Sequence, residues 1–147
     1  MYKAILIDDE PLASNMVKEY LDEYKEIEVV AVCRDGFDGV KAIQQYKPDL
    51  LFLDIQMPKI NGFEMLELIE QPPAVIFTTA FDEHAIKAFE LHATDYLLKP
   101  FSQERFDKAM HRFLSQVRPG AEQSADGQAK NAGQTQALLE TAALSPE

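Results

Sequence analysis

The chain has 147 residues, of which 46% are apolar, so it is long enough for a hydrophobic core and too apolar for global disorder. Its 14 Lys and Arg residues stand against 25 Asp and Glu residues, which gives a net charge of −11. This negative field repels nucleic acid and favours cations, which argues against direct DNA binding by these residues.

Cysteine content and hydropathy indicate where the protein works. Cys33 is the only cysteine, so no intramolecular disulfide can form and a reducing compartment is expected. The N-terminal segment turns acidic after one short apolar run, unlike a signal peptide. No apolar stretch approaches the roughly 18 residues of a membrane span. We therefore expect a cytoplasmic protein with no membrane partner.

Short apolar runs alternate along the chain with amphipathic segments. The predicted strands are residues 4–7, 29–33, 50–53, 74–79 and 95–99. The predicted helices run over residues 11–24, 36–46, 62–71, 82–92 and 102–116. Asp82 and Ser102 are expected to cap the last two helices. This strict alternation predicts a doubly wound α/β domain, with a five-stranded parallel sheet and five helices covering both faces.

The composition changes after about Gln116. Residues 119–136 consist mainly of Ala, Gln, Gly, Ser and Asn, with almost no large apolar side chains. Such a segment cannot form a core and is typical of a linker. We therefore expect one domain over residues 1–116 and a flexible linker or tail over residues 117–147.

Four of the five predicted strands end at polar or charged residues. These are Asp8 and Asp9 after the first strand, Asp54 after the third, Thr79 at the end of the fourth, and Lys99 at the end of the fifth. Each residue alone has an ordinary explanation, such as a helix start, a turn or a solvated charge. Because ligands bind at the carboxyl ends of parallel strands, we expect the whole set to form one site.

The three carboxylates would repel one another unless a cation neutralised them. Mg²⁺ suits this site because it takes oxygen ligands, and the backbone carbonyl of Gln56 could complete the protein ligands. A carboxylate, a metal, a lysine and a hydroxyl are the groups needed to transfer a phosphoryl group to Asp54. The product would be an acyl phosphate.

Four segments together resemble a known family. ILIDDEPLA, PDLLFLDIQMPKINGFEML, VIFTTA and DYLLKPF resemble, in order and spacing, the signature segments of bacterial response-regulator receiver domains over residues 2–116. The segment TTAFDEHAIKAFELHATDYLLKPF further resembles the LytR/AlgR subgroup, whose members usually carry a C-terminal LytTR DNA-binding domain. The resemblance implies the flavodoxin-like receiver fold, with strand order 2-1-3-4-5.

The resemblance also implies a role for each site residue. It implies that Asp54 is the phosphoacceptor. It implies that Asp9, Asp54 and the Gln56 carbonyl bind Mg²⁺ directly and that Asp8 acts through water. It also implies that Thr79, Lys99 and Tyr96 are phosphoryl-binding and switch residues and that the peptide bond before Pro100 is cis. A sensor histidine kinase would donate the phosphoryl group, and phosphorylation would promote homodimerisation. DNA would be bound only through a C-terminal domain absent from this chain. The chain would not be an enzyme beyond Mg²⁺-dependent self-phosphorylation and autodephosphorylation.

Three other classes share parts of this pattern. A haloacid-dehalogenase-type phosphatase also uses Asp, Mg²⁺, Thr and Lys, but its nucleophile follows the first strand in a D-x-D pattern, and no cap domain is available here. A flavodoxin-like FMN carrier needs a phosphate loop where this chain has Asp8, Asp9 and Glu10, which would repel the phosphate. A stand-alone or pseudo-receiver, acting as an interaction module without phosphorylation, stays open.

Overall fold

The computed structural model describes residues 1–117, and the predicted linker or tail at residues 118–147 lies outside the described residues. The described elements are β1 (Tyr2–Ile7), α1 (Pro11–Leu21), β2 (Ile27–Cys33), α2 (Gly36–Tyr46), β3 (Leu50–Asp54), α3 (Gly62–Glu67), β4 (Ala74–Thr79), the 3-10 helix η1 (Asp82–His84), α4 (Ala85–Glu90), β5 (Asp95–Leu98) and α5 (Gln103–Val117). Five parallel strands form one sheet in the order β2-β1-β3-β4-β5, so the predicted fold class and strand order are confirmed. No helix between residues 1 and 117 combines the length and the hydropathy needed to cross a bilayer.

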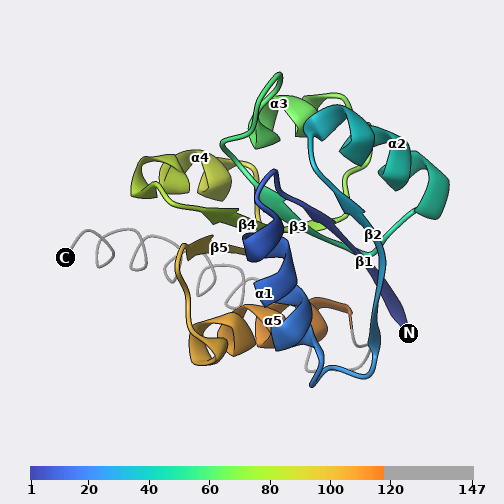
Figure 1. Ribbon diagram of the computed structural model, residues 1–147, viewed down its shortest axis with the longest axis vertical. Helices are drawn as coiled ribbons and strands as arrows, with labels where there is room; N and C mark the ends of the chain where they lie inside the picture. Colours follow the sequence, from blue (N-terminus) through green and yellow to red (C-terminus); the bar gives the residue numbers. More distant parts are fainter. Residues whose placement is uncertain (118–147) are drawn as a thin grey trace, which may run out of the picture. The chain divides into compact units, whose positions relative to one another are not determined.

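The chain divides into two compact units, with the boundary between Thr78 and Thr79. In the first unit, β1 pairs in parallel with β2 and with β3, and β3 pairs in parallel with β4. All five residues of β3 are buried, as expected for a central parallel strand whose sequence is an apolar run ending at Asp54. Helix α1 lies on one side of these strands, and α2 and α3 lie on the other (Figure 1).

The helices of the first unit begin at residues that satisfy their free backbone N–H groups. Asp35 accepts the N–H of Asp38 at 2.9 Å at the start of α2. Asn61 and Glu64 form a reciprocal capping box at the start of α3, with both hydrogen bonds at 2.8 Å. These caps fix the entry of α2 and α3 and therefore the loops that follow β2 and β3.

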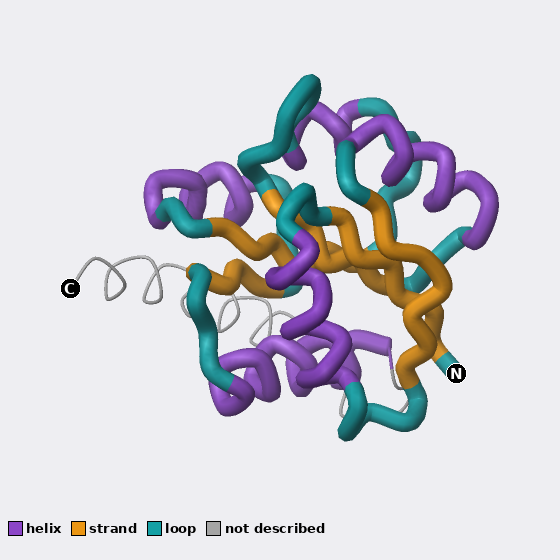
Figure 2. Tube along the Cα trace, in the orientation of Figure 1, coloured by secondary structure: helices purple, strands orange, loops and turns teal. Residues whose placement is uncertain are grey.

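The second unit, described here from residue 79 to residue 117, has its strand β5 between two helices. Figure 2 shows α4 and α5 on opposite sides of β5. The hydroxyl of Ser102 accepts the N–H of Arg105 at 3.1 Å, so the predicted cap of α5 is confirmed. The helix also includes Val117, one residue beyond the predicted domain boundary.

The predicted single helix over residues 82–92 is wrong in three respects. Residues 82–84 form a 3-10 turn, α4 is only six residues long, and Asp82 is not a cap, because Phe81 occupies that position without a side-chain bond. A helix of under two turns buries one narrow face. Ala85 and Ala88 fill that face, whereas Ile86 and Leu91 are 63% and 42% exposed.

Two glycines that begin helices have different neighbours, and they provide a matched test of packing. A Cβ on Gly62 would lie 2.6 Å from the carbonyl oxygen of Asp54 and 3.1 Å from Cα of Ile55, both backbone atoms. A Cβ on Gly36 would lie 2.6 Å and 2.7 Å from side-chain atoms of Ile60, which can rotate away.

We expect Gly62→Ala to lower the free energy of unfolding by about 1–3 kcal/mol, because backbone atoms must shift to admit the methyl group. Gly36→Ala should lower it by less, since both residues open a helix and gain similarly in helix propensity. Urea denaturation of the two variants measures the difference. Equal losses would contradict the packing explanation.

Candidate functional site

The parallel register of β1 and β3 places two acidic residues side by side. Ile7 lies opposite Leu53 in this pairing. Asp8 follows Ile7 and Asp54 follows Leu53, so both side chains lie at the same edge of the sheet. Asp54 is also paired with Thr78 of β4. The carboxyl ends of these strands therefore form the edge at which ligands bind in open α/β sheets.

Three predicted site residues meet at this edge. Asp8, Asp9 and Asp54 each offer a carboxylate oxygen, and these oxygens lie within 4.8 Å of one another. Asp8 and Asp54 are only 6% and 4% exposed, and Asp9 is half-buried. Like charges this close, with little water around them, raise the energy of the site. The cluster therefore favours a bound cation.

Backbone groups orient two of these carboxylates. The N–H of Glu10 donates to Oδ1 of Asp8 at 2.9 Å, and the N–H of Gln56 donates to Oδ1 of Asp54 at 3.3 Å. The turn after β3 is closed by the N–H of Gly62, which donates to the carbonyl of Ile55 at 2.8 Å. This turn carries Gln56, whose carbonyl was predicted as a metal ligand.

The donor set fits Mg²⁺. The cluster offers only carboxylate oxygens, the hard ligands that this ion prefers, and it leaves room in the coordination sphere for water or for a phosphoryl oxygen. The division into direct ligands (Asp9, Asp54 and the Gln56 carbonyl) and one water-mediated ligand (Asp8) stays a prediction.

The second unit brings the other predicted residues together at the ends of β4 and β5. The N–H of Lys99 donates to the carbonyl of Thr79 at 2.7 Å, so these two residues lie next to each other. The fully buried Thr79 accepts the N–H of Phe81 on its hydroxyl at 3.3 Å. The hydroxyl of Tyr96 donates to the carbonyl of Phe81. The peptide bond between Lys99 and Pro100 is cis.

The state of the Tyr96 phenol follows from its surroundings. Burial raises its pKa to about 12, and the nearby charges of Asp82 and Glu83 act in the same direction. The phenol is therefore protonated at neutral pH and can donate to the Phe81 carbonyl.

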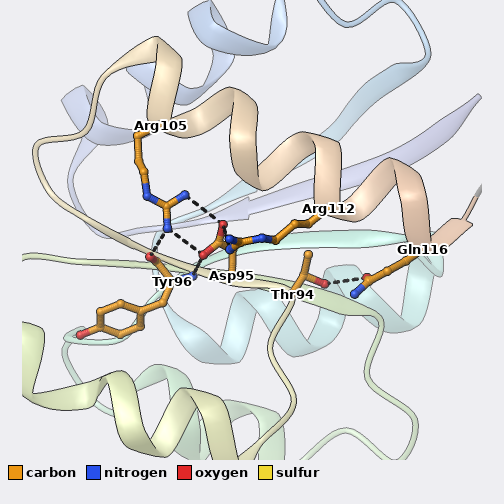
Figure 3. A network of polar contacts seen from close by, with 6 residues as sticks. All are labelled: Thr94, Asp95, Tyr96, Arg105, Arg112 and Gln116. Carbon is orange, nitrogen blue, oxygen red and sulfur yellow. Dashed lines mark hydrogen bonds and ion pairs between the residues drawn. The ribbon is translucent and has the colours of Figure 1, made fainter. Parts of the chain in front are cut away.

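One buried ionic group was missed by the sequence reasoning. Asp95, the first residue of β5, is fully buried and forms ion pairs with Arg105 and Arg112 of α5 (Figure 3). The two arginines are seven residues apart and so lie on the same face of the helix. The spacing of the two arginines at the edge of the apolar face could have indicated a shared acidic partner. It does not show that this partner is Asp95.

Comparison with known proteins gives the class to which this fold and this acidic edge belong. The family model described as the response regulator receiver domain matches residues 4–111, and the chain belongs to this family.

Relatives with curated names are similar over most of the chain. The transcriptional regulatory protein BtsR of Escherichia coli (strain K12) is 48% identical over 114 residues, which cover 76% of this chain and 48% of BtsR. An uncharacterized response regulatory protein of Vibrio cholerae is 48% identical over 118 residues, 79% of this chain and 50% of that protein. The chain thus spans about half the length of these relatives. Its assignment to the LytR/AlgR subgroup stays a prediction.

Solved structures of receiver domains share the fold. The response regulatory domain of mrkE from Klebsiella pneumoniae has a TM-score of 0.72 and 35% identity, covering 78% of this chain and 96% of that one. The receiver domain of AraT from Geobacillus stearothermophilus also has a TM-score of 0.72, with 27% identity, and covers 79% of this chain and 95% of that one.

The acidic cluster predicts opposite effects of one substitution with and without metal. In EDTA, Asp9→Asn should raise the free energy of unfolding by about 1 kcal/mol, because it removes repulsion from Asp8 and Asp54. The same change should abolish most of the increase in Tm that Mg²⁺ gives the wild type. Thermal unfolding with and without Mg²⁺ measures both effects. Glu23→Gln, which removes an exposed charge, is the control, and a full Mg²⁺ response in Asp9→Asn would contradict the assignment.

The single thiol lies at the end of β2, where the carbonyl of Cys33 accepts the N–H of Asp8 at 3.0 Å. Burial, helped by the charges of Asp38 and Asp35, raises the pKa of the Cys33 thiol to about 11. At pH 8 the thiolate fraction is therefore about a hundredfold below that of an ordinary thiol with a pKa of 9.0.

We expect a disulfide reagent to label Cys33 at least about a hundredfold more slowly in the native chain than in urea. The folded state holds this proton more tightly than the unfolded state, so the contribution to stability is complete below pH 9.0 and declines as pH rises toward 11. Labelling at similar rates in both states would show that the thiol is accessible and its pKa is ordinary.

Proposed function

We propose that this chain is the phosphorylation-controlled receiver domain of a two-component transcription regulator, with the domain spanning residues 1–116. One observation carries the proposal. Asp54 is a buried carboxylate at the end of a central parallel strand, and it lies with Asp8 and Asp9 in a cluster suited to Mg²⁺. Membership of the receiver family supports the same reading.

In the proposed reaction, a carboxylate oxygen of Asp54 attacks the phosphorus of a phosphohistidine on a sensor kinase. A phosphorus–oxygen bond forms, the phosphorus–nitrogen bond breaks, and the kinase histidine leaves as the neutral imidazole after protonation. Mg²⁺ bound to the acidic cluster would neutralise negative charge on the phosphoryl oxygens. The chain's own contribution is to hold Asp54 in line and to exclude most water from it.

Three residues of the second unit have proposed roles once the acyl phosphate has formed. The ammonium group of Lys99 and the hydroxyl of Thr79 would bind phosphoryl oxygens. The side chain of Tyr96 would then move in response to the new position of Thr79. The hydrogen bond between the backbones of Lys99 and Thr79 and the bonds of Phe81 to Thr79 and Tyr96 support this grouping. The response is a shift between two populations of conformations.

The proposed output is transcriptional. Phosphorylation would favour a homodimer, and DNA would be bound by a C-terminal domain of the LytTR type outside this chain. The name of the E. coli relative and the length of the relatives, about twice that matched here, support this view. The net charge of −11 supports a receiver that does not itself grip DNA. We propose a cytoplasmic location, which suits the proposed kinase partner.

Acetyl phosphate with Mg²⁺ should add one phosphoryl group to the chain, and Asp54→Ala should accept none. Intact-mass spectrometry measures the addition, with Asp22→Ala, which removes an exposed carboxylate, as the matched control. EDTA should prevent labelling of the wild type.

The outcomes separate the classes of function. Equal labelling of the wild type and Asp54→Ala would overturn the phosphoacceptor assignment. No labelling at all would favour a pseudo-receiver that acts as an interaction module. Phosphate release over many rapid turnovers, from a range of monoesters, would favour a phosphatase.

A further inference from the structure

Hydrogen bonds in the second unit form a continuous path from Thr79 to α5, and Phe81 is its first junction. The N–H of Phe81 donates to Oγ1 of Thr79 at 3.3 Å, and its carbonyl accepts the hydroxyl of Tyr96. Both polar groups of one peptide segment are therefore engaged, so a movement of the Thr79 hydroxyl must change the position of Phe81 or break one of these bonds.

Tyr96 extends this path across the sheet. Neighbouring side chains of a strand point to opposite faces, and Figure 3 shows the ring of Tyr96 pointing away from α5 while Asp95 points toward it. The backbone carbonyl of Tyr96 accepts Nη2 of Arg105 at 3.3 Å. One residue thus contacts the segment after β4 through its side chain and α5 through its backbone.

Asp95 fastens the same strand to α5. Its carboxylate is fully buried and accepts two hydrogen bonds from Arg105, from Nη1 at 3.0 Å and Nη2 at 2.9 Å. It also accepts the N–H of Tyr96 at 2.7 Å, and Nη1 of Arg112 lies 2.7 Å from Oδ2 as an ion pair. A buried carboxylate keeps such partners because losing one leaves charge without compensation.

The two arginines do different work. Arg105 uses both Nη atoms on Asp95 and reaches the backbone of Tyr96 as well, which requires the planar fork of a guanidinium. Arg112 contributes one ion pair, which lacks hydrogen-bond geometry. A lysine can supply the contact of Arg112 but cannot supply all those of Arg105.

Attachment of β5 to α5 continues to the end of the helix. The hydroxyl of Thr94 donates to Oε1 of Gln116 at 3.0 Å. Arg105, Arg112 and Gln116 follow one another at seven and four residues and lie along one face of α5. Strand and helix are therefore fastened over most of the helix length and should move together.

We propose that Arg105 is a positioning residue that couples the Thr79–Phe81–Tyr96 hydrogen bonds to helix α5. The trigger, withdrawal of the Thr79 hydroxyl toward a phosphoryl group, rests on the proposed function, whereas the coupling through Arg105 does not. When Phe81 and Tyr96 shift, the hydrogen bond from Arg105 to the Tyr96 carbonyl transmits the displacement of this backbone to α5. Arg112 moves with them through its ion pair with Asp95.

Hydrogen exchange of α5 amides tests the coupling without any phosphodonor. Tyr96→Phe removes the bond to Phe81 and should lower the protection of α5 at least about threefold relative to β1 amides of the same chain. When Arg105→Lys is already present, Tyr96→Phe should lower the protection of α5 amides by less than half as much. In the matched Arg112→Lys background the full effect should persist. An equal effect of Tyr96→Phe in all three backgrounds would overturn the proposal.

A second measurement uses acetyl phosphate and Mg²⁺ on the same chains. Arg105→Lys should take up one phosphoryl group as the wild type does, but α5 protection should then change at least about threefold less than in wild type or Arg112→Lys. Normal uptake with an undiminished α5 response in Arg105→Lys would overturn the coupling. Absence of uptake in every chain contradicts the proposed function instead, and the Tyr96–Arg105 comparison then decides the coupling alone.

Discussion

The register between β1 and β3 is the constraint on which the acidic edge depends. Ile7 lies opposite Leu53, so Asp8, which follows β1, and Asp54, the last residue of β3, lie next to each other. A shift of one residue would turn every side chain of a strand to the other face and would take Asp54 away from Asp8. All five residues of β3 are buried, so the apolar run before Asp54 carries this charge to the edge of the sheet.

Gly62 shows how closely the rest of the unit is built around this strand end. The first residue of α3 lies against the backbone at Asp54 and Ile55, closer than any side chain would allow. Its N–H also closes the turn after β3, and the capping box at Asn61 fixes the direction in which the helix leaves. The turn that carries Gln56 is thus held from both sides, which is the rigidity that a metal and a transferring phosphoryl group require.

Among residues 1–117, the buried carboxylates lie in two kinds of surroundings. Asp95 is compensated by two arginines and so has the partners of a structural ion pair. Asp8 and Asp54 instead lie beside a third carboxylate, an arrangement that adds repulsion where Asp95 has attraction. Three carboxylates converging at one sheet edge are the arrangement expected at a functional site, and they support the proposal of a cation there.

Sequence reasoning reached the residues at strand ends and failed where the outcome depended on packing between distant segments. The bounds of α2 and β4 agree with the prediction because Gly, Pro and Asp residues punctuate the chain there. The single helix predicted over residues 82–92 is wrong because too few apolar residues there face the core to stabilise a long helix. The chain leaves the helix at His92, whose φ is 60°, and no glycine in the sequence indicates this stop. Asp95 could not be matched with Arg105 and Arg112 because no local pattern relates a strand residue to side chains of the helix that follows it.

The two faces of β5 contact different layers of the second unit. Side chains alternate along a strand, so the ring of Tyr96 contacts one layer while Asp95 contacts the other. Arg105 contacts the Asp95 carboxylate and the backbone carbonyl of Tyr96, so its contacts do not depend on which aromatic side chain follows Asp95. In the proposed coupling, exchange of Tyr96 would alter the contact with Phe81, and exchange of Arg105 would alter the attachment of β5 to α5. The separation of these two contacts is a consequence of strand geometry, and it requires no special conformation of the chain.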